Sequence, residues 1–394
     1  MDLRYLIPFF LSLTLLADNS SLSELNKDDI ELDKQIDDKK STNLKYSWIK
    51  PVVASYSYTI NDQFGVKNKT RYFRVSLDQP IFKSGGIYFA IKYSDASREF
   101  SNILTNLKEQ NLVKKLYESV LNLKKIDLQL KKTALQIKNA KIDIVRKREQ
   151  FDSGLIDSSF LDQAILNRSK LDQLKLDLVN KKSSLLALFK NLSDADYKSV
   201  TLPKFQMVSS DEFVDKNLEL QQAKSKKRQA KELKNMTISN YLPTVSLFGE
   251  YSNKDDSFKI FKQQSSEYKN YGIRVSMPIA DLNMMRNIEI EKLKYIKSKI
   301  ALTQKRRELE NSFELFNNQI NTLQNRADIA NKDIALYDRL VSVTKDGVRA
   351  GDKTKLDLKT LQNSKSISQI EAKIYDRDIQ LLFLDLYAKM SDGV

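Results

Sequence analysis

Residues 101–149 constrain the fold more than any other stretch of this 394-residue chain. They contain neither glycine nor proline and are mostly strong helix formers, so they predict one continuous helix. Five positions along a helix correspond to a rotation of roughly 140°. Two apolar series, each with a seven-residue period, are offset by five positions: Leu116, Leu123, Leu130, Ile137 and Ile144, and Leu121, Leu128, Leu135 and Ile142. Because a two-stranded coiled coil needs only one seam, this helix is predicted to have a neighbour on each of two sides, as one stave of a closed ring.

The composition excludes most catalytic chemistry. The chain has no Cys and no His, which removes disulfides, thiolate and imidazole catalysis and nearly every zinc site. It also lacks a glycine-rich phosphate loop. We therefore expect neither an enzyme nor a bound cofactor or metal.

The formal charge of +15 comes from 66 Lys and Arg residues against 51 Asp and Glu residues. Basic residues lie between the apolar stripes along all the helices and do not form one patch, so compositional drift explains the excess better than a nucleic-acid site. A basic coiled-coil scaffold that binds nucleic acid is an alternative, and strongly salt-dependent binding would be its signature. We expect no nucleic-acid partner.

The N-terminus reads as an export signal. Residues 6–17 form an apolar run after Arg4, too short for the roughly 20 residues of a transmembrane helix. The whole chain divides into a signal peptide (1–17), an N-terminal segment (18–47), a strand pair (48–82), a helical hairpin (83–191), an intervening segment (192–240), a second strand pair (241–282), a second hairpin (283–390) and a tail (391–394).

Both strand pairs alternate apolar and polar residues with a period of two, as strands with one apolar face do. Polar stretches at 61–69 and 253–267 predict surface loops within the pairs. Pro80 and Pro278 are predicted to end the second strand of each pair. Proline suits a point where one hydrogen-bonding pattern stops, and four of the six prolines occupy equivalent strand–helix corners: Pro51, Pro80, Pro243 and Pro278.

Each strand pair is followed by a predicted helical hairpin. In the first, Gly154 marks the turn and Asp157 or Ser158 caps the second helix. In the second, the break falls between Gly347 and Gly351. The order strand, strand, long helix, turn, shorter helix therefore occurs twice, about 195 residues apart, which indicates an internal repeat.

Four amphipathic strands cannot form a stable sheet alone. Their length and alternation match transmembrane β-strands of roughly 9–11 residues, but four are too few to close a barrel and open edges cannot lie in hydrocarbon. Three copies would supply twelve strands and a ring of helices. The alternative is a soluble sheet packed on a coiled coil, with the polar strand faces in water.

Four segments resemble the TolC family of outer-membrane efflux channels: Tyr241-Leu-Pro-Thr-Val-Ser-Leu, Val275-Ser-Met-Pro-Ile, Phe151-Asp-Ser-Gly-Leu and Arg349-Ala-Gly-Asp-Lys-Thr-Lys-Leu-Asp-Leu. The resemblance covers residues 48–390. It implies a mainly α protein with β strands: a homotrimer whose twelve-stranded barrel, in contact with outer-membrane lipids, continues into a periplasmic α-barrel with an equatorial segment at 192–240. This chain departs from the family's pattern at residues 18–47, a segment that is shorter and more polar than the helix pair that the family has before its first strand.

The same resemblance implies a function and partners. Such channels export small molecules, including drugs and toxic compounds, or proteins, as the exit duct of a tripartite efflux or type I secretion system. They work with a periplasmic adaptor and an inner-membrane pump of the RND or ABC type, and contribute to multidrug resistance. The alternative is that this chain is itself a periplasmic adaptor, although adaptors carry one hairpin in a small β domain.

The resemblance also implies site residues. Asp357 and Thr360 fall where the family narrows its periplasmic aperture with acidic residues, and Lys353 falls where a basic residue holds the closed state. Three copies of Asp357 would form an acidic ring; the alternative is an ordinary solvated Asp near a helix start. The hairpin tips should dock the adaptor through Phe151, Gly154, Leu155, Gly347 and Gly351. The barrel lumen should contain Arg74, Asp78, Glu250 and Arg274.

Overall fold

The computed structural model describes residues 22–63, 66–203, 205–258 and 264–391. The predicted signal peptide at 1–17 lies outside this part of the chain. The chain divides into two compact units, and α2 and α6 each contribute to both. The first unit comprises Asn106–Leu218 and Arg307–Val394 with the residues up to Glu31, and the second comprises Leu32–Thr105 and Glu219–Arg306.

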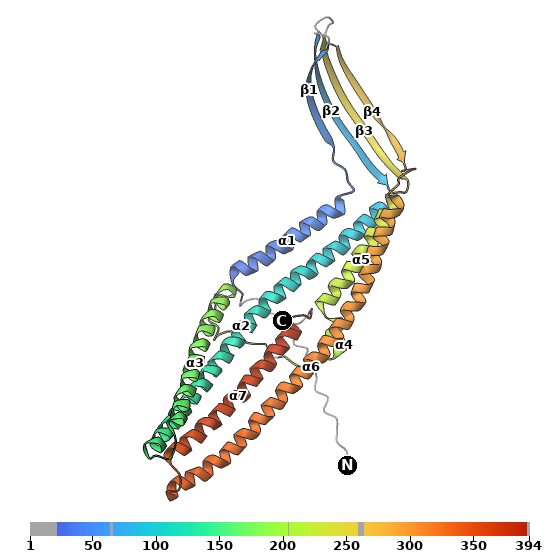
Figure 1. Cartoon of the computed structure of the whole chain (residues 1–394). Helices are drawn as coiled ribbons and strands as arrows, with labels where there is room; N and C mark the ends of the chain where they lie inside the picture. The colour runs from blue at the N-terminus through green and yellow to red at the C-terminus, as the bar shows by residue number, and fades with distance from the viewer. Residues whose placement is uncertain (1–21, 64–65, 204, 259–263, 392–394) are drawn as a thin grey trace, which may run out of the picture. The chain divides into compact units, whose positions relative to one another are not determined.

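The prediction of a mainly helical chain with four strands is confirmed (Figure 1). None of the helices in the described ranges has a stretch apolar enough to span a bilayer. The elements, in order, are α1 (Glu24–Tyr46), β1 (Val53–Gln63), β2 (Val66–Phe82), α2 (Gly86–Asp152), α3 (Ser158–Leu192), α4 (Ser210–Asp215), α5 (Leu218–Ser239), β3 (Thr244–Phe258), β4 (Gln264–Ser276), α6 (Met284–Ala350) and α7 (Lys355–Tyr387).

The four strands form one antiparallel sheet in the order β1-β2-β3-β4 (Figure 1). Pairing continues outward to Gln63 opposite Val66 and to Asp256 opposite Gln264. The prediction of surface loops at 61–69 and 253–267 was therefore wrong over most of both ranges. Polar side chains are compatible with a strand whenever the backbone ladder is satisfied by its neighbours, so the local polarity was a poor guide to the turn position.

Three of the corner prolines lie where the sequence predicted, just outside β1, β3 and β4. Pro80 does not end its strand, because β2 continues to Phe82 with a register shift between the two residues. Pairing of β1 with β2 stops at Ser76, so Pro80 has a neighbour on the β3 side only. A proline without an N–H is tolerated at such a local edge.

In the second unit, four helical segments form a row in the order α1–α2–α5–α6. Between α1 and α2, the hydroxyl of Ser94 donates to the carbonyl of Ser41 at 2.8 Å and Arg98 pairs with Asp38. Between α2 and α5, Arg228 pairs with Glu99 at 2.8 Å. The pair Glu219–Lys305, at 3.1 Å, joins α5 to α6.

The N-terminal segment forms helix α1, although the sequence predicted that it is too short and too polar to match the helices that the family places there. It has 23 residues, against 22 in α5. Its polarity misled the prediction because many of its charged residues face solvent or pair with α2, as Asp38 does with Arg98. One covered face is enough to hold a helix of this length.

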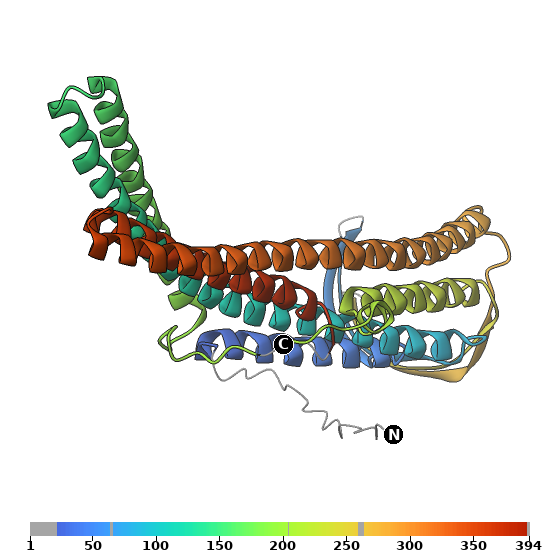
Figure 2. The ribbon, with the colours of Figure 1, turned by 90° about the horizontal axis from the view of Figure 1, so that it is seen from below.

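In the first unit, four helices form another row, in the order α3–α2–α7–α6 (Figure 1; the same helices are seen from below in Figure 2). Helix α2 thus has one neighbour on each side, as its two apolar seams predicted. Leu116 and Leu123 of one seam and Leu121 of the other are at most 1% exposed. The cluster that contains them also includes Phe189 of α3 and Leu384 of α7, both at most 2% exposed.

The segment between α3 and α5 is attached to α6 and α7 by aromatic rings. Phe213 of α4 stacks on Phe313 of α6 with ring centroids 5.6 Å apart. Phe205 lies 5.0 Å from the ring of Tyr387 on α7. Such pairs contribute about 0.5–1.5 kcal/mol beyond their buried area, so this long connection is a packed part of the first unit.

Candidate functional site

The first turn of α7 is fixed by a capping box between Thr354 and Asp357. The backbone N–H of Asp357 donates to the Thr354 hydroxyl at 3.1 Å, and the backbone N–H of Thr354 donates to Asp357 Oδ2 at 3.0 Å. The Thr354 hydroxyl also donates to that oxygen, at 2.7 Å. This arrangement satisfies two of the backbone N–H groups that a helix start leaves unpaired.

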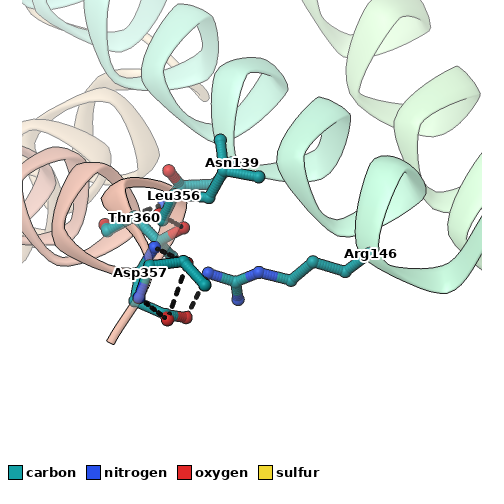
Figure 3. Close-up of polar contacts among 6 residues, drawn as sticks. Asn139, Arg146, Leu356, Asp357 and Thr360 are labelled. Atoms are coloured by element: carbon teal, nitrogen blue, oxygen red, sulfur yellow. Dashed lines mark hydrogen bonds and ion pairs between the residues drawn. The ribbon is translucent and has the colours of Figure 1, made fainter. Parts of the chain in front are cut away.

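The second carboxylate oxygen of Asp357 binds a different helix. Arg146, near the end of α2, donates to Asp357 Oδ1, and the two side chains are 34% and 35% exposed (Figure 3). The predicted gate residue is therefore neither free in solvent nor merely a cap. Its charge is balanced by an arginine that the sequence analysis did not identify.

The environment lowers the pKa of the Asp357 carboxyl. The hydrogen bond from the backbone N–H of Thr354 is the largest cause, and the Thr354 hydroxyl and the charges of Arg146 and Lys353 act in the same direction. Each of these contacts favours the ionised carboxylate. Asp357 consequently stays charged at neutral pH.

The Arg146–Asp357 pair is the last step of a series of polar contacts between α2 and α7, which we call the polar ladder. Residues at each step are seven positions from the next on both helices. One step is uncharged: the amide of Asn139 donates to the hydroxyl of Ser364 at 3.4 Å, and Asn139 Oδ1 also accepts from the amide of the adjacent Asn363 at 2.8 Å. The charged steps of the ladder are Lys125–Asp378, Lys132–Glu371 and Arg146–Asp357.

The sequence contained the signal for this ladder. Lys125, Lys132, Asn139 and Arg146 recur every seven residues on α2, as do Asp357, Ser364, Glu371 and Asp378 on α7. In two antiparallel helices with a constant register, the residue numbers of the two partners in each contact add up to the same value. The charged pairs meet that condition. This polar row lies beside the apolar seams and has the same seven-residue period.

The other predicted gate residues lie around the same turn. Thr360 donates its hydroxyl to the carbonyl of Leu356 at 2.9 Å, and its own carbonyl accepts from the Asn139 amide at 3.4 Å (Figure 3). Lys353 packs against Gly347, since a Cβ on that glycine would lie 2.8 Å from Lys353 Cγ. The structure thus brings Asp357 and Thr360 to the α2–α7 contact, whereas Lys353 contacts the end of α6.

The hairpin tips differ in one respect from the prediction. Gly154 and Gly351 have positive φ values of 72° and 86°, as turn glycines do, but Gly347 lies inside α6 and not in the turn. At the first tip, Asp157 caps α3 by accepting from the backbone N–H of Ser159. Phe151 and Leu155 are 42% and 75% exposed, so both are accessible to a partner.

The four predicted lumen residues meet on one face of the sheet in two ion pairs. Arg74 donates to Glu250 at 2.8 Å, and Arg274 donates to Asp78 at 2.5 Å. Arg274 also lies over the ring of Phe248, 4.6 Å from its centroid. Phe248 was not among the predicted lumen residues, although its position in the polar phase of β3, between Ser246 and Glu250, places it on this face.

The capping box predicts a pH dependence. A carboxyl whose pKa is lowered by folding stabilises the fold above its unfolded pKa of about 3.9, and this stability is lost as the pH falls through the lower folded value. We expect Asp357→Asn to destabilise the protein by about 1 kcal/mol near pH 7. Thermal unfolding followed by circular dichroism should show the two proteins converging as the pH falls below about 4. A difference that is independent of pH between about 3 and 7 would show that the Asp357 charge does not stabilise this turn.

Comparisons with known proteins relate this geometry to a family. Residues 210–381 match the profile of the outer membrane efflux protein family. No curated protein sequence matches the chain significantly. The matched family is one of efflux proteins and the similar structures below include outer membrane channels, which confirms the prediction that the chain is not an enzyme.

Solved structures match along almost the whole chain. The Campylobacter jejuni CmeC outer membrane channel matches with a TM-score of 0.68 at 15% identity, over 96% of this chain and 85% of that one. The Vibrio cholerae outer membrane protein VceC matches with a TM-score of 0.68 at 10% identity, over 92% and 93%. The Neisseria gonorrhoeae MtrE outer membrane channel, in an open state, matches with a TM-score of 0.62 at 12% identity, over 96% and 87%. The profile match and the shared fold confirm that this chain is similar to the TolC-like family of outer-membrane efflux channels.

Proposed function

We propose that three copies of this chain form an outer-membrane channel that serves as the exit duct of an efflux or type I secretion system. The observation that carries this proposal is that every layer of the chain is an open row of four elements. Within the described ranges, the sheet has two free edges, β1 and β4, and each helical row has two end helices with a neighbour on one side only.

One face of the sheet supports a place in lipid. Large apolar side chains on the two edge strands are at least half exposed, which is costly in water but favourable in hydrocarbon. The unpaired backbone of β1 and β4 cannot lie in a bilayer unless it is hydrogen-bonded. Antiparallel pairing of β4 with β1 of another copy satisfies it, and three copies give twelve strands. The exposed residues are Tyr56, Tyr58 and Ile60 on β1 and Tyr271, Ile273 and Val275 on β4.

The end helices of the first unit carry most of its exposed apolar side chains. Helix α3 has seven and the part of α6 from Arg307 has five, whereas α7 has one. On α6, the apolar row that faces the chain's own helices is buried, with Phe313 at 6% and Ile320 at 4% exposure, while Leu315, Ile329 and Val343 of the other row are 58%, 58% and 70% exposed. Contact between α6 of one copy and α3 of the next covers both surfaces.

The second unit has the same arrangement. The exposed apolar residues Leu32 and Ile36 lie on α1, and Leu293 and Ile300 lie on α6, at opposite ends of its row. Both halves of the chain have the order helix, strand, strand, long helix, shorter helix. We infer that the halves are copies of one ancestral repeat, which supports a closed ring because equivalent elements then alternate around it.

The Arg146–Asp357 pair is the proposed gate contact. In the ring, three copies of the α7 start lie around the axis at the tips of the helices. While each Asp357 is paired with Arg146, its carboxylate is neutralised and α7 is held to α2. Breaking the pair leaves three carboxylates, each still capping α7, without the arginine charge that neutralises them. Their mutual repulsion favours a wider aperture, and their charge attracts cations.

The hairpin tips are the proposed docking sites for a periplasmic adaptor, which would connect the duct to an inner-membrane pump of the RND or ABC type. Phe151 and Leu155 offer exposed apolar contacts there. The transported substrates are proposed to be small molecules, including drugs and toxic compounds, or proteins. The alternative that this chain is an adaptor is disfavoured because it has two hairpins and a sheet with an exposed apolar face.

Membrane fractionation tests the proposal directly. We expect the full-length protein in the outer-membrane fraction, after removal of an N-terminal signal, and migrating as a trimer in unheated denaturing electrophoresis but as a monomer after boiling. A chain that remains soluble and monomeric without detergent, with intact β circular dichroism, would contradict the proposal.

Conductance of the purified channel in lipid bilayers tests the gate. We expect Arg146→Ala to increase the open fraction, and Asp357→Ala to weaken cation selectivity and block by divalent cations. Asp346→Ala is the matched control, because that carboxylate lies near the same tip but pairs with Arg349 at 3.4 Å, both side chains being 71% exposed. If Asp357→Ala behaves like this control, Asp357 takes no part in the gate.

A further inference from the structure

The connection from β4 to α6 carries the most exposed apolar side chains of the described residues. Within residues 277–285, which we call the β4–α6 corner, Ile279 is 98% and Leu282 is 96% exposed, with Met285 at 74%. The corner is not a loose loop. Asp281 accepts from the backbone N–H groups of Asn283, through Oδ1 at 2.8 Å, and of Met284, through its carbonyl at 3.1 Å.

The connection from α1 to β1 carries a second exposed apolar group. Within residues 46–53, the α1–β1 corner, Tyr46 is 53%, Ile49 is 50% and Val52 is 64% exposed. Gln79 of β2 holds this corner in place. Its Oε1 accepts from the backbone N–H of Lys50 at 2.8 Å, and its amide nitrogen donates to the carbonyl of Trp48 at 3.3 Å.

The two corners cannot cover each other within one chain. They continue from β1 and β4, which lie at opposite edges of the sheet with two strands between them. Neighbouring strands are about 4.8 Å apart, so the two edge strands of this four-stranded sheet are separated by about 14 Å. Each corner is thus a fixed apolar surface that no other described part of the chain covers, at the same end of the sheet and next to a free edge.

We propose that the β4–α6 corner of one copy packs against the α1–β1 corner of the next, forming a clasp at each junction of the ring. This inference rests on the proposed trimer and goes beyond it by assigning the contact. If β4 and β1 of adjacent copies pair with their helix-side ends level, Ser276 lies opposite Val53. Residues 277–282 then run beside residues 47–52 of the neighbour.

Charge favours a second copy over lipid as the occupant. Asp281 is exposed between Ile279 and Leu282, and would face the phosphates of anionic lipids unfavourably. Exposed Lys45 and Lys50 flank the apolar residues of the other corner. A clasp between copies therefore brings a carboxylate near two ammonium groups while both apolar surfaces are covered.

Cysteine cross-linking in the full-length protein in membranes tests the clasp, because the natural chain has no Cys. We expect Ile49→Cys with Ile279→Cys, treated with a short bis-maleimide, to yield covalent dimers and trimers that survive boiling. Each variant with a single substitution should yield none. The matched control pair is Ile49→Cys with Leu293→Cys. The second site is equally apolar and 57% exposed, but it lies nine residues after Met284, the first residue of α6, and so about 14 Å along the helix axis beyond the corner.

The outcomes separate this inference from the proposed trimer. Unheated electrophoresis of the same samples reports whether the trimer exists. If the trimer forms but the Ile49→Cys and Ile279→Cys thiols fail to cross-link, the clasp is overturned. In that case, quenching of a fluorophore on the Ile279→Cys thiol by spin-labelled lipid would identify lipid as the occupant. A trimer that cross-links equally through the control pair would also overturn it. Absence of any trimer would contradict the proposed function itself.

Discussion

The structure depends on covering the apolar flanks of very long helices. Helices α2 and α6 each have 67 residues, and a helix of that length with two apolar flanks needs a neighbour along both. The chain supplies both neighbours to α2, whose seams are covered by α3 and α7. Among the residues that the structure describes, it supplies only one to α6, whose second apolar row is exposed. Burial of such residues stabilises a structure by about 1.5–3 kcal/mol for each large side chain, so the uncovered flank is a strong drive toward association.

The contact between α2 and α7 changes in character along its length. Beyond the buried cluster around Leu121 and Leu384, the two helices are joined toward the tip by the polar ladder, whose charged side chains are about one-fifth to one-third exposed. Partly exposed ion pairs contribute little each and respond to salt and pH. Such a contact can be separated without unfolding either helix, which is the property that a gate at the tips requires.

Much of this architecture follows from local patterns in the sequence. The two seams of α2, the Asp157 cap and the turn glycines Gly154 and Gly351 each reflect the geometry of a single helix or turn. The predictions were wrong where contacts between segments distant in the sequence determine the structure. Residues 61–69 are polar yet pair as strands, α1 is polar yet packs on α2, and Asp357 was placed at the gate without its partner Arg146, because ion pairs between distant helices depend on a register that one helix alone does not reveal.

The central claim is that a single chain leaves its sheet edges and the flanks of its end helices uncovered, and that further copies of the same chain cover them. The mass of the assembled particle in detergent, measured by native mass spectrometry, tests this most directly. The account requires a particle with three times the mass of the mature chain, with no free monomer at concentrations where the helices are folded. A folded single chain, or a stable assembly of two or four copies, would contradict it.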